Sequence, residues 1–378
     1  MSWILSVAII VTLSTSLALV TRWRNVVCNG EIPMPLFTFV AILFTSGLDV
    51  GLVMFPLVDF RTYANDPAYG FANPLAVEFG FWGFLVWAFY FLTTFYFCVI
   101  EPRLLLFERP VIKFVNNVVI IGTCAFTAFL FLQYLPEYVT GIPDMARYGL
   151  VAVVILLSVL SSTHLRYVKA LSLGSTWLFF GLIAGLWWVS GMGAGGLFKS
   201  MGNIGAYFSH LPRFALPISD YHQFYLYWWF AWSIMIGQFV SRFVGGLKSW
   251  QLLLTLLVVP SIPIAVWFSV LYYYFSHDLV VTGAWRWLMV VVGVIFVINS
   301  LDSLVRLYTR NLGLSVGRLG MPVYVSCNWL LLALLVLLYR FTPLKIEWFG
   351  LMVVGIYAAV YWQVFRRRAV LQENVNIP

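Results

Sequence analysis

The sequence predicts an all-α, polytopic membrane protein, and three observations support this fold class. Hydrophobic residues make up 62% of the 378 residues, and charged residues make up only 10%. The mean hydropathy is +0.93, and this composition leaves too little polar surface to cover a water-soluble domain of this size. Long apolar runs also recur along the chain, each near the length that crosses about 30 Å of hydrocarbon as a helix.

Eleven of these runs are predicted to span the bilayer. In chain order they cover residues 3–21, 34–57, 78–100, 111–135, 146–165, 173–192, 222–242, 250–274, 283–306, 321–340 and 346–365. The odd number of spans predicts that the two ends of the chain lie on opposite sides of the membrane.

The basic residues predict which side is which. Fifteen of the 22 Lys and Arg residues fall in alternate loops and the C-terminal tail if these are cytoplasmic. Because basic residues are enriched in cytoplasmic loops, we expect a multi-pass protein of the cell (inner, cytoplasmic) membrane with an external N-terminus and a cytoplasmic C-terminus. This loop bias accounts for the net charge of +8, so we expect no nucleic-acid partner.

The loop at residues 193–221 divides the spans into two groups. It is too long for a simple connection and too apolar for a disordered linker, so we expect a short amphipathic helix within it. Five spans precede it, starting at residue 34, and five follow it; an odd number per half gives two similar halves opposite orientations. We therefore divide the chain into a peripheral helix and cytoplasmic loop (1–33), a first five-helix repeat (34–192), an external connecting loop (193–221), a second five-helix repeat (222–365) and a cytoplasmic tail (366–378).

The second predicted span is interrupted near its middle by Ser46-Gly47-Leu48-Asp49-Val50-Gly51. Glycine weakens a helix and lets a ligand approach the backbone, and a carboxylate at this depth is costly unless it faces a cavity or a partner. The break therefore predicts a functional site that includes Asp49. The alternative is a glycine pair that packs against another helix, with Asp49 hydrogen-bonded to that helix.

Aromatic residues crowd the span at 222–242. Trp228 and Trp232 are one helical turn apart, and Tyr225 is a turn before Trp228, while Trp229 lies about 100° round the helix. Stacked indoles attract a quaternary ammonium group, which has no hydrogen-bond donor and is bound by dispersion and the ring quadrupole. The alternative is that these rings are packing residues or an interfacial belt.

No pattern typical of an enzyme occurs in the sequence. The four histidines form no HExxH motif, no GxxxxGK phosphate loop is present, and the four cysteines lack the spacing of metal ligands. We therefore expect no enzyme activity and no cofactor apart from a coupling ion. His222, near the outer end of the tryptophan-rich span, is either a pH-sensitive gate or a solvated loop residue.

Five stretches together resemble the betaine/choline/carnitine transporter (BCCT) family. Trp228-Trp229-Phe230-Ala231-Trp232-Ser233 resembles the family's signature tryptophan helix, and Phe44 to Gly51 resembles its glycine-rich unwound helix. The other three matches are Trp82 to Tyr90, Pro260-Ser261 with Trp267-Phe268-Ser269, and Phe296 to Ser303.

This resemblance implies a LeuT-type core of ten helices in two inverted five-helix repeats, here residues 34–365, plus one N-terminal peripheral helix. It also implies alternating access around a central substrate site. Carried over by position, the substrate-binding residues would be Trp82, Tyr90, Trp228, Trp229, Trp232, Asp49, Gly47 and Gly51.

The resemblance further implies an ion-coupling site at the unwound helix, made by Ser46, Leu48, Asp49, Phe296, Asn299 and Ser300. Sodium-dependent members have two hydroxyls at the positions of Asn299 and Ser300, so Na⁺ would bind there through an amide oxygen and a hydroxyl. The alternative for Asn299, Ser300 and Asp302 is helix capping. Asp49 replaces a family glycine, and its carboxylate would attract a cation or carry a coupling proton.

We therefore predict a secondary active transporter that imports a small quaternary ammonium or amine compound, choline-like, together with H⁺ or Na⁺ by alternating access. A fixed carboxylate beside an aromatic site favours a cation over a zwitterion. One alternative is a sodium-coupled betaine or carnitine carrier; another is an amine receptor or regulatory membrane protein that does not transport. The expected partners are the amine substrate and the lipid bilayer, and the resemblance implies a homotrimer.

Overall fold

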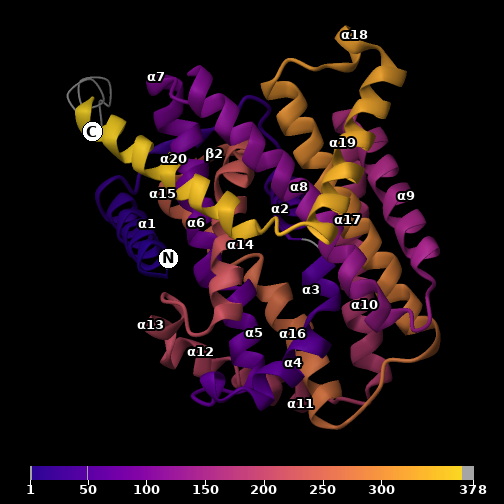
Figure 1. The fold of residues 1–378 in the computed structure, drawn as a ribbon. Helices are drawn as coiled ribbons and strands as arrows, with labels where there is room; N and C mark the ends of the chain where they lie inside the picture. The colour runs from indigo at the N-terminus through magenta and orange to yellow at the C-terminus, as the bar shows by residue number, and fades with distance from the viewer. Residues whose placement is uncertain (1, 49, 368–378) are drawn as a thin grey trace.

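The computed structural model describes residues 2–48 and 50–367, and in this part of the chain the regular structure is helical apart from one two-stranded sheet. Figure 1 shows the arrangement of its elements. The elements are α1 (Ser2–Arg22), β1 (Val27–Asn29), α2 (Leu36–Gly47), α3 (Val50–Met54), α4 (Pro56–Asn65), η1 (Pro67–Tyr69), α5 (Pro74–Trp82), η2 (Phe84–Val86), α6 (Trp87–Phe95), η3 (Tyr96–Ile100), α7 (Glu101–Leu104), α8 (Pro110–Tyr138), α9 (Asp144–Ser162), α10 (Leu165–Val189), α11 (Ala194–Gly202), α12 (Gly205–Ser209), α13 (Leu211–Phe214), α14 (Asp220–Val240), η4 (Ser241–Phe243), β2 (Gly245–Lys248), α15 (Ser249–Leu257), α16 (Ser261–Ser276), α17 (Gly283–Asn311), α18 (Val316–Leu319), α19 (Met321–Phe341) and α20 (Ile346–Arg366).

Nine helical stretches in the described part of the chain are long and apolar enough to cross a membrane. They are Trp3–Arg22, Pro74–Leu104, Pro110–Tyr138, Asp144–Ser162, Leu165–Val189, Ser249–Ser276, Gly283–Asn311, Met321–Phe341 and Ile346–Arg366. Hydrocarbon offers no hydrogen-bond partners, and a helix pairs its backbone N–H and C=O groups internally. Helical stretches of this length therefore suit a bilayer. The chain is a multi-pass, all-α membrane protein, as the composition predicts.

Helices also occupy the two predicted spans that lie outside these nine. Residues 222–242 correspond to the continuous helix α14. Residues 34–57 correspond to α2, α3 and the start of α4, so this span is divided as the sequence predicts. Helices thus lie at all eleven predicted positions, and the number of them that cross the membrane stays a prediction.

The division between α2 and α3 has a local cause. Leu48 has an extended backbone, with φ −128° and ψ 148°, and it ends α2 after Gly47. The interruption frees carbonyl groups that must find other partners inside an apolar bundle. The Tyr90 hydroxyl donates to the Gly47 carbonyl at 3.3 Å, and the Ser300 hydroxyl donates to the Leu48 carbonyl at 2.8 Å. Two neighbouring helices therefore stabilise the break.

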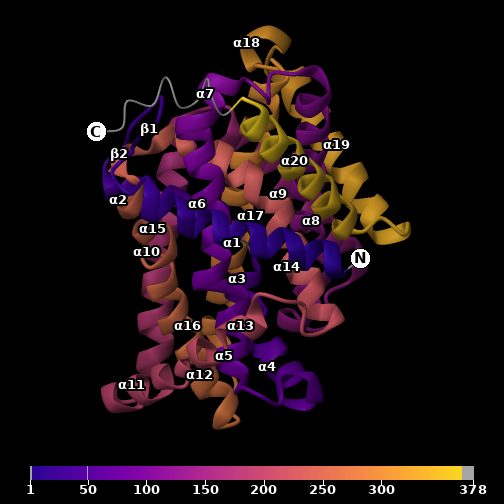
Figure 2. The same cartoon turned by 90° about the vertical axis from the view of Figure 1, so that its left-hand side faces the viewer.

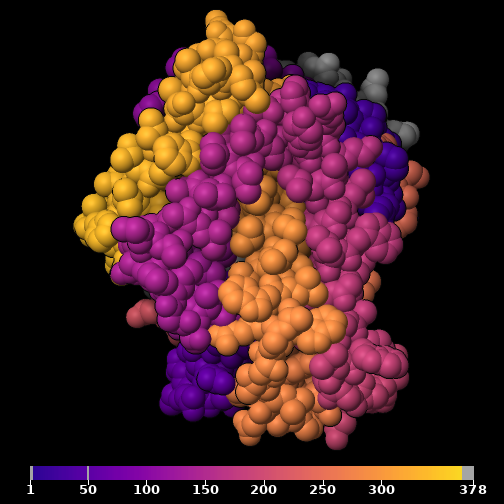
Figure 3. Space-filling model, turned by 90° about the vertical axis from the view of Figure 1, so that its right-hand side faces the viewer, coloured from indigo at the N-terminus to yellow at the C-terminus, as the bar shows by residue number. Residues whose placement is uncertain are grey.

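Helices α14 and α17 lie inside the bundle. α17 packs against α2, α3, α8, α9 and α10, and α14 packs against α2, α6, α8 and α20. The outer face of α17 reaches the surface between α9 and α10, where it forms the orange band of Figure 3. The tryptophan-rich helix α14 is thereby held in the interior, beside the broken helix.

Helix α1 lies on the outside of the bundle. It packs against α6, α14 and α15, and it crosses the bundle obliquely in the view of Figure 2. This position agrees with a peripheral helix at residues 3–21.

The two ends of the molecule carry different elements. One end carries α7, α18 and the sheet formed by antiparallel β1 and β2, and the opposite end carries α4, α11, α12 and α13 (Figure 1). The expected amphipathic helix in the 193–221 loop corresponds to the three short helices α11, α12 and α13. The domain boundaries, including the inverted repeats, stay predictions.

Candidate functional site

Aromatic residues of α5 and α14 meet inside the bundle. The Trp82 ring lies 5.6 Å from the Trp228 ring and 5.2 Å from the Trp229 ring, edge-on to both. The Trp228 and Trp229 rings stack on each other at 5.3 Å. Tyr225 lies 5.8 Å from Trp82 and 5.6 Å from Trp228. All four side chains are fully buried, and we call Trp82, Tyr225, Trp228 and Trp229 the aromatic cluster.

Tyr90 and Gly47 connect the aromatic cluster to the broken helix. The Tyr90 ring lies 6.4 Å from the Trp229 ring, and its hydroxyl donates to the Gly47 carbonyl. A Cβ atom at Gly47 would lie 3.4 Å from the Tyr90 ring, which is ordinary van der Waals contact. The structure therefore brings together five predicted site residues, namely Gly47, Trp82, Tyr90, Trp228 and Trp229.

Trp232 is buried on α14, but among the described residues its ring forms no stacked or edge-on pair with a ring of the aromatic cluster. The indole N–H groups of Trp82, Trp228 and Trp232 have no hydrogen-bond partner in the described part of the chain. The Trp229 N–H, in contrast, donates to the Phe81 carbonyl at 2.7 Å. The Trp229 side chain is thus fixed by its own hydrogen bond, whereas the N–H groups of the other three indoles form no hydrogen bond of strict geometry among the described residues.

The predicted ion-coupling residues meet at the break between α2 and α3. Ser300 of α17 donates to the Leu48 carbonyl at 2.8 Å, and its Oγ lies 3.5 Å from the Thr45 carbonyl oxygen. Ser46 forms a hydrogen bond of 2.8 Å with Ser303, also on α17. Neutral carbonyl and hydroxyl oxygens therefore gather at one point, and this donor set fits a hard cation such as Na⁺.

Asn299 precedes Ser300 on α17 and is fully buried. Its amide nitrogen donates to Ser175 at 2.7 Å, and its amide oxygen has no partner among the described residues. Asn299, Ser300 and Asp302 lie inside α17, which runs from Gly283 to Asn311, so the helix-capping interpretation is wrong.

Phe296 has a packing contact in this structure. Its ring lies 6.1 Å from Phe44 of α2 and 5.5 Å from Phe179 of α10. Its side chain therefore fills the space between α2, α10 and α17.

Two further residues of the break, Asp49 and Gly51, are predicted from the sequence. Asp49, the predicted cation-recognition and coupling residue, lies outside the described residues. Gly51 lies in α3 and is buried, and its carbonyl accepts from the Phe55 N–H at 3.0 Å. The predicted roles of both residues stay predictions.

His222 is not a solvated loop residue, so that interpretation is wrong. It is 1% exposed, and its ring stacks on Phe81 at 4.4 Å. Its Nδ1 atom accepts from the Ile218 N–H at 3.2 Å. Because Nδ1 accepts, the ring is neutral and carries its single proton on Nε2.

Sequence analysis missed a group of buried acids and tyrosines next to the aromatic cluster. Asp59 of α4 is 2% exposed and Glu78 of α5 is 0% exposed. Tyr63 lies between them, with its hydroxyl 2.8 Å from Glu78 Oε2 and 3.4 Å from Asp59 Oδ2. The available signal was the position of both acids at the edges of apolar spans, where a carboxylate needs a partner.

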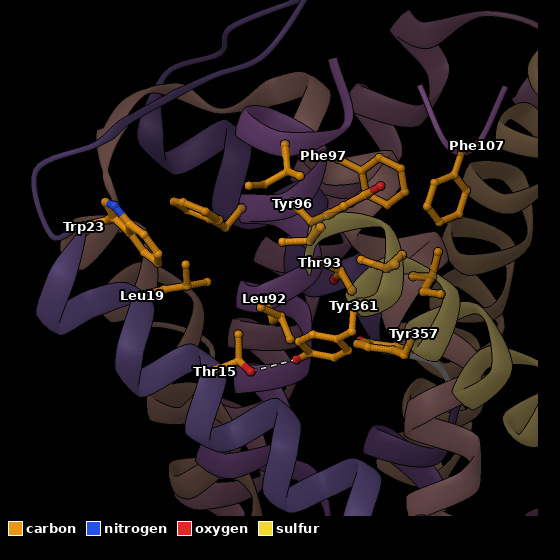
Figure 4. A pocket seen from close by; sticks show the side chains of 15 residues that line it. Thr15, Leu19, Trp23, Leu92, Thr93, Tyr96, Phe97, Phe107, Tyr357 and Tyr361 are labelled. Atoms are coloured by element: carbon orange, nitrogen blue, oxygen red, sulfur yellow. Dashed lines mark hydrogen bonds between the residues drawn. The ribbon is translucent and has the colours of Figure 1, made fainter. Parts of the chain in front are cut away.

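A cavity of about 270 Å³ lies apart from these residues, between α1, α6, η3 and α20 (Figure 4). Its walls are apolar, and Tyr361 donates to Thr15 at its edge at 2.8 Å. Neither the aromatic cluster nor Gly47 and Leu48 at the helix break contribute to its lining. In the described residues no group of three or more His, Cys, Asp and Glu side chains could hold a metal ion.

Comparisons with known proteins give one family match. Residues 108–274, a little under half of the chain, match the model of BCCT, the betaine/carnitine/choline family transporter. This range contains the tryptophan helix and the Pro260-Ser261 motif, so the predicted resemblance is confirmed there; the other three motifs lie outside the match. A search of curated proteins found no match.

One solved structure is similar over most of the chain. It is a Na⁺-coupled sialic acid symporter in a substrate-bound, outward-open state, 14% identical, and the similarity covers 94% of this chain and 82% of that chain with a TM-score of 0.48. Similarity at this level supports no conclusion about the substrate or the coupling ion of this chain.

Proposed function

We propose that the chain is a secondary active transporter that imports a small quaternary ammonium compound, choline-like, by alternating access with a coupling ion. The main observation behind this proposal is the buried aromatic cluster on α5 and α14. Tyr90 and Gly47 connect this cluster to the interrupted helix α2–α3. Indole faces bind a quaternary ammonium without needing a hydrogen bond from it. The BCCT family match over α14 supports the same substrate class.

The proposed orientation follows from the basic residues. The end that carries α7, α18 and the β1–β2 sheet is cytoplasmic in this proposal, and the end that carries α11, α12 and α13 is external. Arg103, Arg242, Arg310 and Arg318 belong to elements or loops of the first end, in keeping with the enrichment of basic residues on the cytoplasmic side. In this proposal the protein resides in the cell membrane.

The experiment is uptake of labelled choline into proteoliposomes, with a proton gradient and a sodium gradient imposed separately. We expect accumulation above the level in protein-free vesicles, and we expect unlabelled choline to compete better than betaine or carnitine. Binding in detergent with no accumulation under either gradient would contradict transport and favour an amine receptor.

A second candidate is a sodium-coupled carrier of betaine or carnitine, and one observation favours it. The Thr45 and Leu48 carbonyls, the Ser300 hydroxyl and the unpartnered Asn299 amide oxygen offer neutral oxygens to Na⁺ at the helix break. Bound sodium would stabilise the folded protein by mass action. A higher Tm in NaCl than in KCl, lost in Asn299→Ala, together with betaine uptake driven by sodium, would support this candidate over the first.

A further inference from the structure

The buried acids Asp59 and Glu78 share one hydrogen-bond donor. The single hydroxyl proton of Tyr63 faces Glu78 Oε2 at 2.8 Å and Asp59 Oδ2 at 3.4 Å, so the shorter bond goes to Glu78. Among the described residues, neither carboxyl group forms an ion pair with Lys, Arg or His. Two acids thus lie within reach of one phenol, with no basic side chain paired to either of them in the described part of the chain.

The other donors favour Asp59. Tyr221 donates to the Asp59 carboxyl, with both oxygens at 3.0 Å, and Tyr225 donates to Oδ2 at 3.0 Å. Glu78 Oε1, in contrast, is buried and has no hydrogen-bond partner. Hydrogen bonds to a carboxylate stabilise its charged form, and burial without partners stabilises the neutral form. Asp59 is therefore the charged member of the pair, and Glu78 is the member that holds a proton.

Like charges at this separation also oppose each other. Two carboxylates within reach of one phenol in a low-dielectric interior do not both ionise, because an unpaired buried charge costs several kcal/mol and the second charge adds repulsion. Proton exchange of such a pair belongs to both groups together. The pair therefore binds one proton in the structure as described.

A polar cavity lies at the end of the molecule that carries α4. Its volume is about 310 Å³, and it is lined by Leu57, Val58 and Arg61 of α4, which flank Asp59 in sequence, and by Glu137 and Arg286. Neither acid lines the cavity, but its position beside α4 makes this end the side from which we infer that protons reach the pair.

The surroundings of the pair contain few groups that would compete for the proton. The elements around the pair are α4, η1, α5, α8, α12, α14 and α16. Their nearby titratable side chains are Tyr63, Tyr69, Tyr134, Tyr138, Tyr207, Tyr221, His222, Tyr225 and Tyr272. The charged side chains that line the polar cavity are Arg61, Glu137, Asp278 and Arg286. Burial raises the pKa of Tyr69, in the η1 loop, to about 12. That phenol keeps its proton at neutral pH.

The pair is joined to the aromatic cluster by two residues. Tyr225 donates to Asp59 and places its ring against Trp82 and Trp228. Glu78 lies one helical turn before Trp82 on α5, and the Trp82 indole N–H interacts with the Glu78 carboxyl, although without strict hydrogen-bond geometry. A change in charge at the pair therefore acts directly on residues of the proposed substrate site.

We propose that Asp59 and Glu78 form the proton-binding site that couples the proton gradient to substrate movement. This inference rests on the proposed transport function. A proton from the external side adds to the Glu78 carboxylate to give the carboxylic acid, the loaded carrier reorients, and the same proton leaves Glu78 for the cytoplasm. Substrate and proton therefore move together, and uptake is expected to rise as the external pH falls.

The test uses the full-length protein in proteoliposomes and in detergent. Glu78→Gln imitates the protonated acid, so we expect it to lose accumulation driven by a proton gradient, while it still exchanges labelled external choline for unlabelled internal choline at a rate independent of pH. Asp59→Asn is a second variant that we expect to lose accumulation driven by a proton gradient. Size-exclusion chromatography and thermal unfolding check that both variants fold.

The matched control is Glu101→Gln at the opposite end of the molecule. Glu101 also accepts from a tyrosine, Tyr96, at 2.6 Å, but it shares no donor with a second acid among the described residues. It is expected to keep the accumulation and the pH dependence of the wild type. Accumulation driven by protons with an unchanged pH profile in Glu78→Gln would overturn the proposal, and so would wild-type uptake that responds only to sodium.

A readout without transport separates this proposal from the proposed function. The infrared difference spectrum between acidic and alkaline samples in detergent should contain a protonated carboxyl band that is absent in Glu78→Gln and present in Glu101→Gln. If that band behaves as expected but no gradient drives uptake of any amine, the result supports proton binding by the pair and contradicts the proposed transport function. If the band persists in both Glu78→Gln and Asp59→Asn, the pair is not the proton site.

Discussion

Among single residues, Trp228 has the greatest share of aromatic surroundings in the proposed site. Its ring pairs with the rings of six aromatic residues, namely Trp82, Tyr225, Trp229, Phe55, Phe126 and Phe224. A desolvated cation–π contact is worth about 2 kcal/mol, which corresponds to about a 30-fold change in affinity. We therefore expect Trp228→Ala to raise the apparent KM for choline by about that factor, as measured by initial uptake rates.

The control for this prediction is Trp177→Ala on α10. Trp177 is 63% exposed, so it has the same side chain outside the proposed site and should leave KM unchanged. An equal rise in both variants would indicate a general loss of folded protein, and no rise in Trp228→Ala would remove this residue from the site.

Asp49 gives a second prediction for a single residue. Asp49 stays the predicted cation-recognition residue, and a carboxylate in that role attracts a cation and repels a substrate that carries its own carboxylate. We expect Asp49→Asn to weaken choline binding and to improve competition by betaine, as measured by displacement of labelled choline. Its pH dependence should stay that of the wild type, because Glu78 holds the proton; loss of the pH dependence here would move the coupling role to Asp49.

The sequence alone could predict some site residues and not others, for a physical reason. Trp228 and Trp229 share one helix, and Trp82 and Tyr90 share one motif, so spacing and resemblance were enough to find them. Asp59 and Glu78 lie on different helices, and they meet only because the chain turns back between α4 and α5. A hydrogen bond between separate helices leaves no periodic signal in a sequence.

Among the elements, the interrupted helix α2–α3 depends on donors from its neighbours. Composition and length predicted the helices, and Gly47 with Gly51 predicted the break, but the groups that satisfy its free carbonyls come from α6 and α17. A sequence cannot say which side chains will reach those carbonyls, because this depends on how the helices are packed.

Ser300→Ala tests this dependence. It removes the donor to the Leu48 carbonyl, and a buried carbonyl without a partner costs about 1–3 kcal/mol. We expect a lower Tm in thermal unfolding of the purified protein. Ser209→Ala is the control, since Ser209 is exposed and bonds only within its own helix; a Tm for Ser300→Ala equal to that of Ser209→Ala would mean that the break does not need this donor.

At the scale of the whole molecule, backbone contacts at the α7–α18 end join the segment that follows α1 to the segment that follows α14. The Gly30 N–H donates to the Val244 carbonyl at 2.8 Å, and the Ile32 N–H donates to the Arg242 carbonyl at 2.8 Å. The Glu31 carboxylate also pairs with Arg310 at 2.7 Å and with Arg242 at 3.5 Å. Because Glu31 is exposed, these ion pairs add little to the stability of this end. The backbone hydrogen bonds contribute most to holding the two segments together.

Gly30→Ala is expected to open this end. A Cβ atom at Gly30 would lie 2.3 Å from the Arg242 carbonyl carbon, a distance that forces the two segments apart. Cys28, which is fully buried in β1, should then react faster with a maleimide, measured in a variant whose other three cysteines are serine. Gly317→Ala is the control at the same end, because a Cβ there meets open space. The proposed alternating access requires this end to open. Faster labelling of Gly30→Ala with retained choline exchange would therefore fit an equilibrium shifted toward the open state. An unchanged labelling rate in Gly30→Ala would show that this contact does not hold the end closed.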